Sequence, residues 1–258
     1  ICHLPSAICH LLLLQVTSIS KRFGPTQALT DVSFAVGVGE TVALIGPSGC
    51  GKSTLLRIIN GIVPADAGCI DVGDLRLSRD TVDGLRHRTG YVIQEGGLFP
   101  HLTAQDNSAV LARYLRWPAD RISGRVEELA DAVRLPASLL SRFPLELSGG
   151  QRQRVSLMRA LFVDPTVLLL DEPLGALDPM IRAELQTDLR DLFHRFRKTV
   201  VLVTHDVAEA AFFADRIVLM NAGRTVQEGS LSDLERRPAS EFVATFMSAQ
   251  RMTHGGVA

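Results

Sequence analysis

The sequence predicts an α/β fold in which a wound parallel sheet carries an inserted helical subdomain. Continuous Val, Leu and Ile runs, such as Thr41–Ile45 and Val167–Asp171, are typical of strands buried on both faces of a parallel sheet. Helical patterns follow several of these runs, so that strand, turn, helix and strand recur along the chain. One long segment, residues 102–163, departs from this alternation because its pattern is almost wholly helical.

The individual elements follow from the same periodicities. Strands are expected over residues 13–20, 29–36, Thr41–Ile45, 91–94, Val167–Asp171, 199–204 and 216–220. Helices are expected over residues 52–60, 152–162, Pro179–Phe196 and 206–214, with two short helices in residues 231–246 on either side of Arg237-Pro238.

These elements make one domain over residues 13–248, with the helical subdomain at about residues 95–163 and a tail at residues 249–258. Residues 1–12 are apolar and lack the basic segment of a secretory signal, so we interpret them as a non-native or disordered leader. The dipeptides Cys2-His3 and Cys9-His10 within this leader do not have the spacing of a zinc module.

The composition excludes several classes of protein. The 258 residues can bury a substantial core, and 46% of them are apolar, as in globular proteins. Lysine and arginine (27) nearly balance aspartate and glutamate (28), so no broad basic surface for a nucleic-acid partner is expected. Four cysteines are too few for a disulfide scaffold and favour a reducing compartment. The apolar runs are far shorter than the roughly 20 residues that span a bilayer.

A glycine-rich segment, GPSGCGKST, lies between a predicted strand and a predicted helix. This is the arrangement of a phosphate-binding loop, in which backbone N–H groups and a helix N-terminus face the phosphates. Lys52 is expected to reach the β- and γ-phosphates and Ser53 to bind Mg²⁺. Cys50 is expected to be a reactive thiol near the helix N-terminus, with a buried thiol that a reagent cannot reach as the alternative. The alternative is a chance glycine-rich turn. The predicted nucleotide-binding residues are Gly46, Pro47, Ser48, Gly49, Cys50, Gly51, Lys52, Ser53 and Thr54.

Two carboxylates end the apolar run VLLLDEP. A buried strand that brings Asp171 beside the phosphate loop would supply a second Mg²⁺ ligand. Glu172 follows at once and is placed to accept a proton from water that attacks the γ-phosphate. The alternative is a pair of carboxylates that only end a strand in solvent.

The segment LSGGQ lies at the end of the helical insert and begins a strong helical pattern. Ser148 is suited to cap that helix, and the backbone N–H groups of Gly149 and Gly150 can approach an anion without a side chain in the way. The alternative is a purely structural helix start.

Together these motifs resemble the ATP-binding cassette (ABC) family. Gln94 after the strand at 91–94, Gly175-Ala176-Leu177-Asp178 after the acidic pair, and His205 after the strand at 199–204 are similar to the family's Q-loop, D-loop and switch histidine. The resemblance covers residues 13–246 and includes the order of the motifs. It implies a P-loop NTPase (RecA-like) core sheet with an antiparallel β subdomain and an inserted α-helical subdomain.

The resemblance also implies roles for single residues. Phe23 is similar to the aromatic residue that stacks on adenine, although it could instead pack in the core. Gln94 would contact Mg²⁺ or the attacking water, and His205 would hold Glu172 and the γ-phosphate in register. The implied catalytic set is therefore Glu172, His205, Gln94 and Lys52, the metal ligands are Ser53, Gln94 and Asp171, and the cofactors are ATP and Mg²⁺.

The family's assembly implies the partners. Two such domains would pair head to tail, in a homodimer, so that each ATP lies between the phosphate loop of one copy and the residues Ser148, Gly149, Gly150, Gln151 and Asp178 of the other. Permease subunits and an extracytoplasmic solute-binding protein would complete an importer on the cytoplasmic face of the inner membrane, with this chain bound peripherally.

The segment QEGGLFPHLT, residues 94–103, is similar to importers of the osmoprotectants glycine betaine and choline. An ATPase subunit of such an importer is the function that the sequence favours. The alternatives are an importer of another small solute, such as an amino acid or a polyamine, and a soluble ABC ATPase without a permease.

Overall fold

The computed structural model describes residues 12–94, 96–175 and 177–254, and the chain divides into two compact units. Unit 1 consists of Ile1–Arg86 and Thr199–Ala258, and unit 2 of His87–Lys198. The dipeptides Cys2-His3 and Cys9-His10 lie outside the described residues. Within the described ranges, no helix is both long enough and apolar enough to cross a membrane.

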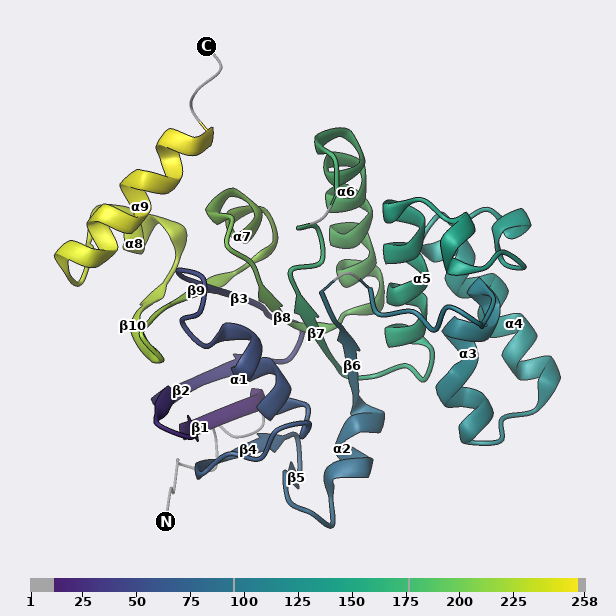
Figure 1. The fold of residues 1–258 in the computed structure, drawn as a ribbon, viewed down its shortest axis with the longest axis horizontal. Coiled ribbons are helices and arrows are strands. Elements are labelled where there is room, and N and C mark those ends of the chain that lie inside the picture. The colour runs from purple at the N-terminus through teal and green to yellow at the C-terminus, as the bar shows by residue number, and fades with distance from the viewer. Residues whose placement is uncertain (1–11, 95, 176, 255–258) are drawn as a thin grey trace. The chain divides into compact units, whose positions relative to one another are not determined.

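Unit 1 contains an antiparallel sheet and a mainly parallel one (Figure 1). The antiparallel sheet has the order β2-β1-β4-β5, in which Leu14 of β1 lies opposite Val36 of β2 and Val72 of β4. Its elements are β1 (Leu12–Phe23), β2 (Thr26–Gly37), β4 (Ala67–Val72) and β5 (Leu75–Arg76). This sheet confirms the antiparallel β subdomain that the resemblance implied.

The second sheet of unit 1 places β3 between β8 and β9, parallel to both, and β10 pairs antiparallel with β9. All residues of β3 and β8 are buried, as their continuous apolar sequences predict. The elements are β3 (Thr41–Ile45), β8 (Thr199–Val203), β9 (Arg216–Asn221) and β10 (Arg224–Gly229), with the helices α1 (Lys52–Ile59), α7 (Val207–Phe213), α8 (Leu231–Arg236) and α9 (Glu241–His254).

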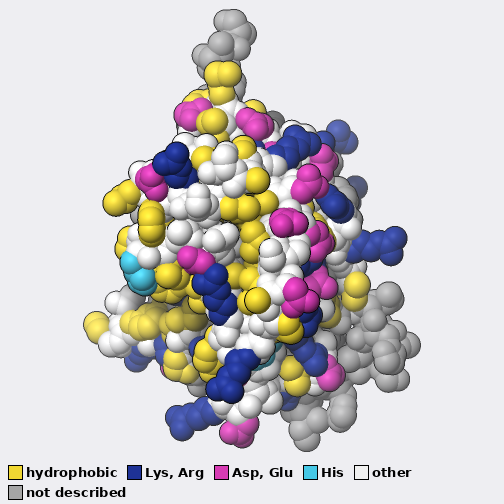
Figure 2. All heavy atoms as spheres, turned by 90° about the vertical axis from the view of Figure 1, so that its right-hand side faces the viewer, with side chains coloured by type: hydrophobic (Ala, Val, Ile, Leu, Met, Phe, Trp, Pro, Cys, Tyr) yellow, Lys and Arg dark blue, Asp and Glu magenta, His cyan; other side chains and the backbone are white. Residues whose placement is uncertain are grey.

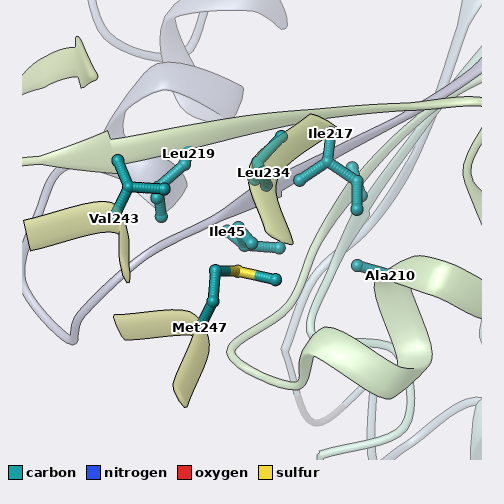
Figure 3. Close-up of a cluster of buried hydrophobic side chains, with 8 residues drawn as sticks. Ile45, Ala210, Ile217, Leu219, Leu234, Val243 and Met247 are labelled. Carbon is teal, nitrogen blue, oxygen red and sulfur yellow. The ribbon is translucent and has the colours of Figure 1, made fainter. Parts of the chain in front are cut away.

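The C-terminal helices α8 and α9 pack on this sheet through buried apolar side chains (Figure 3). The cluster draws on β3, α7, β9, α8 and α9, and α9 extends through the first residues of the expected tail. Its members are Ala43, Ile45, Ala210, Ile217, Leu219, Leu234, Val243 and Met247. Burial of this cluster ties the C-terminal segment to the strand that precedes the phosphate loop.

Unit 2 contains one parallel strand pair and most of the helices of the expected insert. Strands β6 (Thr89–Val92) and β7 (Val167–Asp171) are parallel, and α3, α4 and α5 lie side by side (Figure 1). The helices are α3 (Ala104–Tyr114), α4 (Ala119–Ala132), α5 (Gly149–Leu161) and α6 (Pro179–Phe196), with short 3-10 turns at Ala137–Leu139 and Pro144–Glu146. On the face that Figure 2 views, acidic and basic side chains are interspersed.

Some elements differ from the sequence-based expectation. The strands β4, β5 and β10 and the helix α2 (Val82–Arg88), which crosses from unit 1 into unit 2, were not predicted. Strand β10 has the sequence RTVQEG and no fully buried residue, so it lacks both the apolar run and the clear alternation that indicate a strand. Helix α6, by contrast, has the predicted bounds.

Candidate functional site

The loop between β3 and α1 is shaped by its glycines. Gly46 has φ 145°, and a Cβ atom there would lie 2.1 Å from the carbonyl oxygen of Met220. Gly51 has φ 106° and caps α1, and its Cβ atom would lie 2.6 Å from a methyl carbon of Leu29. Larger residues would therefore both strain the backbone and collide with it, so the close packing of this loop requires glycine at both positions.

Lys52, the first residue of α1, turns its ammonium group back onto the loop. Nζ donates to the carbonyl oxygens of Gly46 at 2.8 Å and Pro47 at 3.0 Å, and it lies 3.7 Å from Cys50 Sγ. The residue is 6% exposed, and it has no carboxylate partner within the described part of unit 1. Because buried cations are normally paired with anions, this arrangement leaves room for the charge of a phosphate.

The remaining loop residues differ in exposure. Ser48 and Gly49 are exposed, and Ser53 and Thr54 are half-buried. Cys50 is only 4% exposed, which corrects the expectation of a reactive thiol: the helix N-terminus is nearby, but a reagent cannot reach the sulfur in this conformation.

His205 lies at the same edge of the sheet as the phosphate loop. Strands β3 and β8 are parallel, with Leu44 opposite Val203, and the Thr204 N–H donates to the Leu44 carbonyl at 3.2 Å. The loop follows β3 and His205 follows β8, so both leave the sheet at its carboxyl edge. Asp206 accepts N–H groups at the start of α7, and this cap fixes the backbone on which the exposed His205 stands.

In unit 2, β6 and β7 bring a second pair of predicted residues together. Their parallel pairing places Val92 opposite Leu170, so Gln94 and the acidic pair follow at the same edge. Gln94 Nε2 donates to Glu172 Oε2 at 3.4 Å. Asp171 ends the fully buried strand β7 and is itself 2% exposed, while Glu172 is half-buried. The structure therefore joins the predicted base to the predicted water-contacting amide.

The backbone at Glu172 is unusual. Its φ of 46° lies in the left-handed region, which residues with a side chain seldom adopt, and its carbonyl accepts from the Gly175 N–H at 3.2 Å. The turn then leads to Asp178, whose carboxylate accepts from the Ile181 N–H at 3.0 Å. Asp178 thus caps α6, and its exposed position is compatible with the predicted contact to a second subunit.

The LSGGQ segment forms the predicted helix start. Ser148 Oγ accepts from the Gln151 N–H at 3.3 Å, and Gln151 Oε1 accepts from the Ser148 N–H at 2.9 Å, so the two residues form a capping box. Gly149 and Gly150 are the first two helical residues, and a Cβ atom on Gly150 would lie 2.7 Å from Ile181 Cγ2. The N–H groups at this helix end face no intrahelical acceptor, as anion binding requires.

Phe23 at the end of β1 is 48% exposed, which excludes the core-packing alternative. Lys21 Nζ lies 5.4 Å from the centre of its ring. An exposed aromatic face is what stacking on a planar base needs.

The predicted metal ligands have suitable donor chemistry. Ser53, Gln94 and Asp171 offer hydroxyl, amide and carboxylate oxygens, which are the hard ligands that Mg²⁺ prefers. The described residues contain no group of three or more His, Cys, Asp or Glu side chains that could hold a metal ion. The predicted set needs none, because its one carboxylate is that of Asp171, and Mg²⁺ in nucleotide sites is held by one or two carboxylates together with phosphate oxygens. Contact of Asp171 with the phosphate loop stays a prediction.

Two residues near Gln94 were missed in the sequence. Ser156 and Arg159 on α5 donate hydrogen bonds to the carbonyl oxygens of the turn at Gly96 and Gly97. Burial lowers the pKa of Arg159 from its ordinary value. The spacing of three residues on one helix face was the available signal, but nothing in the sequence indicated what this face contacts.

Comparison with known proteins places these features in a family. The family model described as "ABC transporter" matches residues 29–175. The choline transport ATP-binding protein OpuBA of Bacillus subtilis is 42% identical over 93% of this chain and 63% of its own length. The osmoprotectant import ATP-binding protein OsmV of Salmonella typhimurium is 44% identical over 90% of this chain and 61% of its own. The sulfate/thiosulfate import protein CysA of Bordetella parapertussis is 47% identical over 94% of this chain and 69% of its own.

Among solved structures, a dimeric post-hydrolysis state of the ATP-binding cassette MJ0796 bound to ADP and Pi matches with a TM-score of 0.76 and 32% identity. The match covers 85% of this chain and 99% of that one. The chain spans less than two thirds of the length of the first curated relatives, 63% in the case of the choline transport protein.

Proposed function

Because this chain belongs to the ABC transporter family, we propose that it is the nucleotide-binding subunit that hydrolyses ATP to ADP and phosphate and so powers an importer. The observation that carries the proposal is the phosphate loop. Its buried Lys52 ammonium contacts only backbone carbonyls and a thiol within unit 1, at the N-terminus of α1. A polyphosphate would supply the missing negative charge.

In this proposal the bound nucleotide contacts two sets of residues, and the Mg²⁺ ion contacts a third. Phe23 stacks on the adenine, and the loop from Gly46 to Thr54 surrounds the phosphates. When bound, Mg²⁺ neutralises charge on the β- and γ-phosphates, with Ser53, Gln94 and Asp171 as its protein ligands.

Glu172 is the general base of the proposed reaction. Its carboxylate accepts a proton from the attacking water, while Gln94, which contacts it at 3.4 Å, orients that water. His205 keeps the γ-phosphate and Glu172 in register, and Lys52 stabilises the charge that develops on the phosphate. Each of these roles positions or polarises existing groups, as phosphoryl transfer demands.

A second copy of the chain completes each site in this proposal. Ser148, Gly149, Gly150, Gln151 and Asp178 of one copy face the ATP held by the other. Support comes from the dimeric state of the 32% identical cassette and from the helix start at Ser148, which offers N–H groups to an anion. ATP then bridges the copies, and its hydrolysis releases them.

The proposed importer also contains permease subunits and an extracytoplasmic solute-binding protein, and the chain associates with the cytoplasmic face of the membrane. We propose a quaternary amine, glycine betaine or choline, as the solute. The names of the relatives from B. subtilis and S. typhimurium support this, together with residues 94–103. A sulfate importer is the second candidate, because the Bordetella relative has the higher identity, 47%.

Replacement of Glu172 tests the proposed chemistry. Glu172→Gln keeps the size of the side chain but cannot accept the proton, so it should bind ATP and lose about 10²- to 10⁴-fold in turnover. The variant should then accumulate an ATP-bound dimer, which size-exclusion chromatography with Mg-ATP detects. Glu127→Gln, on the exposed face of α4, is the matched control. Near-normal hydrolysis by Glu172→Gln would remove this residue from the mechanism.

Reconstitution of the full importer in liposomes tests the solute. Glycine betaine, choline, proline, a polyamine and sulfate are added separately with the solute-binding protein, and the ATPase rate is measured. Stimulation by glycine betaine or choline is expected. Stimulation by sulfate or by the polyamine alone would overturn the proposed solute and leave the ATPase assignment standing.

A further inference from the structure

The turn that follows Gln94 is held from one side by helix α5. Ser156 Oγ donates to the Gly96 carbonyl at 2.9 Å, and Arg159 Nη2 donates to the same oxygen at 2.8 Å. Arg159 Nη1 donates to the next carbonyl, that of Gly97, at 2.8 Å. Ser156 and Arg159 are three residues apart and therefore lie on one face of the helix. Two successive carbonyls are thus bound by one short stretch of α5.

The turn itself has little freedom to move independently of Gln94. Gly96 has φ 76° and Gly97 φ 52°, and the Gly96 N–H donates to the Ile93 carbonyl at 3.0 Å. A Cβ atom on Gly97 would lie 2.1 Å from Ile93 Cδ1, so the turn folds back tightly on the residue before Gln94. Whatever displaces the Gly96 and Gly97 carbonyls therefore displaces the backbone that carries Gln94.

The hydrogen bonds between Arg159 and the turn are expected to be strong. A guanidinium group has N–H donors in a rigid planar fork, and hydrogen bonds from a charged donor are stronger than those between neutral groups. Gly96 is buried, so its carbonyl has no water to replace the two donors if they are removed. Ser156 is fully buried as well. Loss of Arg159 would leave the turn attached to α5 by the Ser156 hydroxyl.

The other end of α5 is the LSGGQ segment. Ser148 caps the helix, and the capping box with Gln151 fixes its first turn. The 13 residues of α5 form one continuous helix, so Arg159 lies on the same rigid element that Ser148 caps. Helix α5 therefore links the turn after Gln94, which contacts the proposed base Glu172, with the residues proposed to contact the ATP of the second copy.

We propose that Arg159 is a positioning residue that makes the Gln94 segment and the helix beginning at Ser148 move together. The inference rests on the proposed function, because it assigns to Arg159 a part in ATP hydrolysis without contact to ATP. Removal of the guanidinium should uncouple the two segments and lower turnover, while the phosphate loop of the isolated subunit still binds nucleotide.

Substitution of Arg159 by methionine and by lysine tests the proposal in the full chain. Arg159→Met should lower kcat for ATP at least about tenfold with KM within about twofold, because charge-assisted bonds are lost and the phosphate loop is untouched. Arg159→Lys should recover part of kcat, since an ammonium can reach one of the two carbonyls. Arg76→Met is the matched control, because it also removes two arginine hydrogen bonds, those from Arg76 in β5 to the carboxylate of Asp71 in β4.

Amide hydrogen exchange provides a readout that a merely structural role would not change. In the unsubstituted protein, Mg-ATP should protect the Gln94 turn and the first turn of α5 together. In Arg159→Met, protection of one segment should no longer accompany protection of the other. If Arg159→Met does not fold, Arg159→Lys and Ser156→Ala carry the same test with smaller effects.

The outcomes are distinct. Wild-type kcat and joint protection in a folded Arg159→Met protein would overturn the inference, as would an equal loss of kcat in Arg76→Met. Absence of ATP hydrolysis by the unsubstituted protein would instead overturn the proposed function, and the inference would then be decided by the exchange measurement alone.

Discussion

Replacement of Asp188 by asparagine is expected to lower the free energy of unfolding by about 3 kcal/mol, whereas replacement of its nearest arginine costs about 1 kcal/mol or less. Asp188 lies on α6, and its side chain is 4% exposed. Arg154 of α5, 9% exposed, contacts Asp188 Oδ2 at 2.7 Å, and Arg134, 61% exposed, contacts Oδ1 at 2.5 Å. The shorter contact is thus the more solvated one.

The expected changes in the free energy of unfolding for Asp188 and Arg134 depend on the burial of each side chain rather than on the length of the contact. Removing one member of a buried ion pair typically costs about 3–5 kcal/mol, because the other charge stays behind without compensation. We expect the lower end of this range, because Arg154 keeps Glu184 Oε1 at 2.9 Å and the Val133 carbonyl as partners. Both contacts to Asp188 are also ion pairs without hydrogen-bond geometry. The contact of Arg134 with Asp188 should contribute only about 0–1 kcal/mol, because Arg134 is 61% exposed and water replaces its partner, while Asp188 keeps Arg154.

Urea unfolding of Asp188→Asn, Arg154→Met, Arg134→Gln and the double variant Asp188→Asn/Arg154→Met measures these terms, with the slope of the transition checked for each protein. The double variant should cost less than the sum of its two single changes, because each single change leaves one buried charge without its buried partner. A larger loss in Arg134→Gln than in Asp188→Asn would refute the argument from burial.

Three further predictions concern other parts of the molecule. Lys52→Ala should weaken ATP binding by the isolated subunit at least about tenfold, whereas Ser148→Arg should leave that binding intact and abolish hydrolysis. A fluorescent-nucleotide titration and an ATPase assay check both variants. Loss of ATP binding in Ser148→Arg would contradict the proposal that Ser148 acts on the ATP of a second copy. Cys50 should react with a maleimide far more slowly in the folded than in the denatured protein, as measured by mass spectrometry, because it is 4% exposed; equal rates would show that the loop opens freely. The Lys21 hydrogen bond lowers the pKa of the Asp66 carboxyl below its ordinary value of 3.8, so the contribution of this carboxylate to stability is present above that pH and is lost as the pH falls through the lowered pKa. The difference in urea midpoint between wild type and Asp66→Asn should therefore shrink below about pH 4, and a difference independent of pH would contradict this.

Local sequence was sufficient for the elements that are buried throughout. The apolar runs of β3, β7 and β8 and the long helical pattern of α6 predicted those elements with nearly the observed bounds. Strands such as β4 and β10 escaped prediction because half-buried, short and partly polar segments carry weak periodicity. Their pairing partners, more than their own residues, make them strands.

The residues of the candidate site also fall into those that local sequence identifies and those that it does not. The phosphate loop, the capping box at Ser148 and the strand that ends at Asp171 are contiguous motifs, so their residues could be identified directly. The contact of Arg159 with Gly96 joins residues 63 positions apart and could not be read from either segment alone. For Cys50 the motif was recognised but the inference was wrong. Its place near the helix N-terminus predicted a reactive thiol, whereas packing against the loop buries the side chain.

The hydroxyl group of Ser148 at the start of α5 can accept one hydrogen bond and donate another at the same time. Toward the helix, a lone pair of Ser148 Oγ receives the Gln151 N–H; the hydroxyl hydrogen remains for an outside acceptor such as a phosphate oxygen. Aspartate would cap the helix as well but would bring no hydrogen and a repelling charge, and alanine would supply neither function. Glycine would separate the cap from the hydroxyl donor, because it caps a helix at a cost of only about a few tenths of a kcal/mol but has no hydroxyl group. A subunit with glycine at this position should keep its own helix and lose only the hydrogen bond proposed to reach the ATP of a second copy.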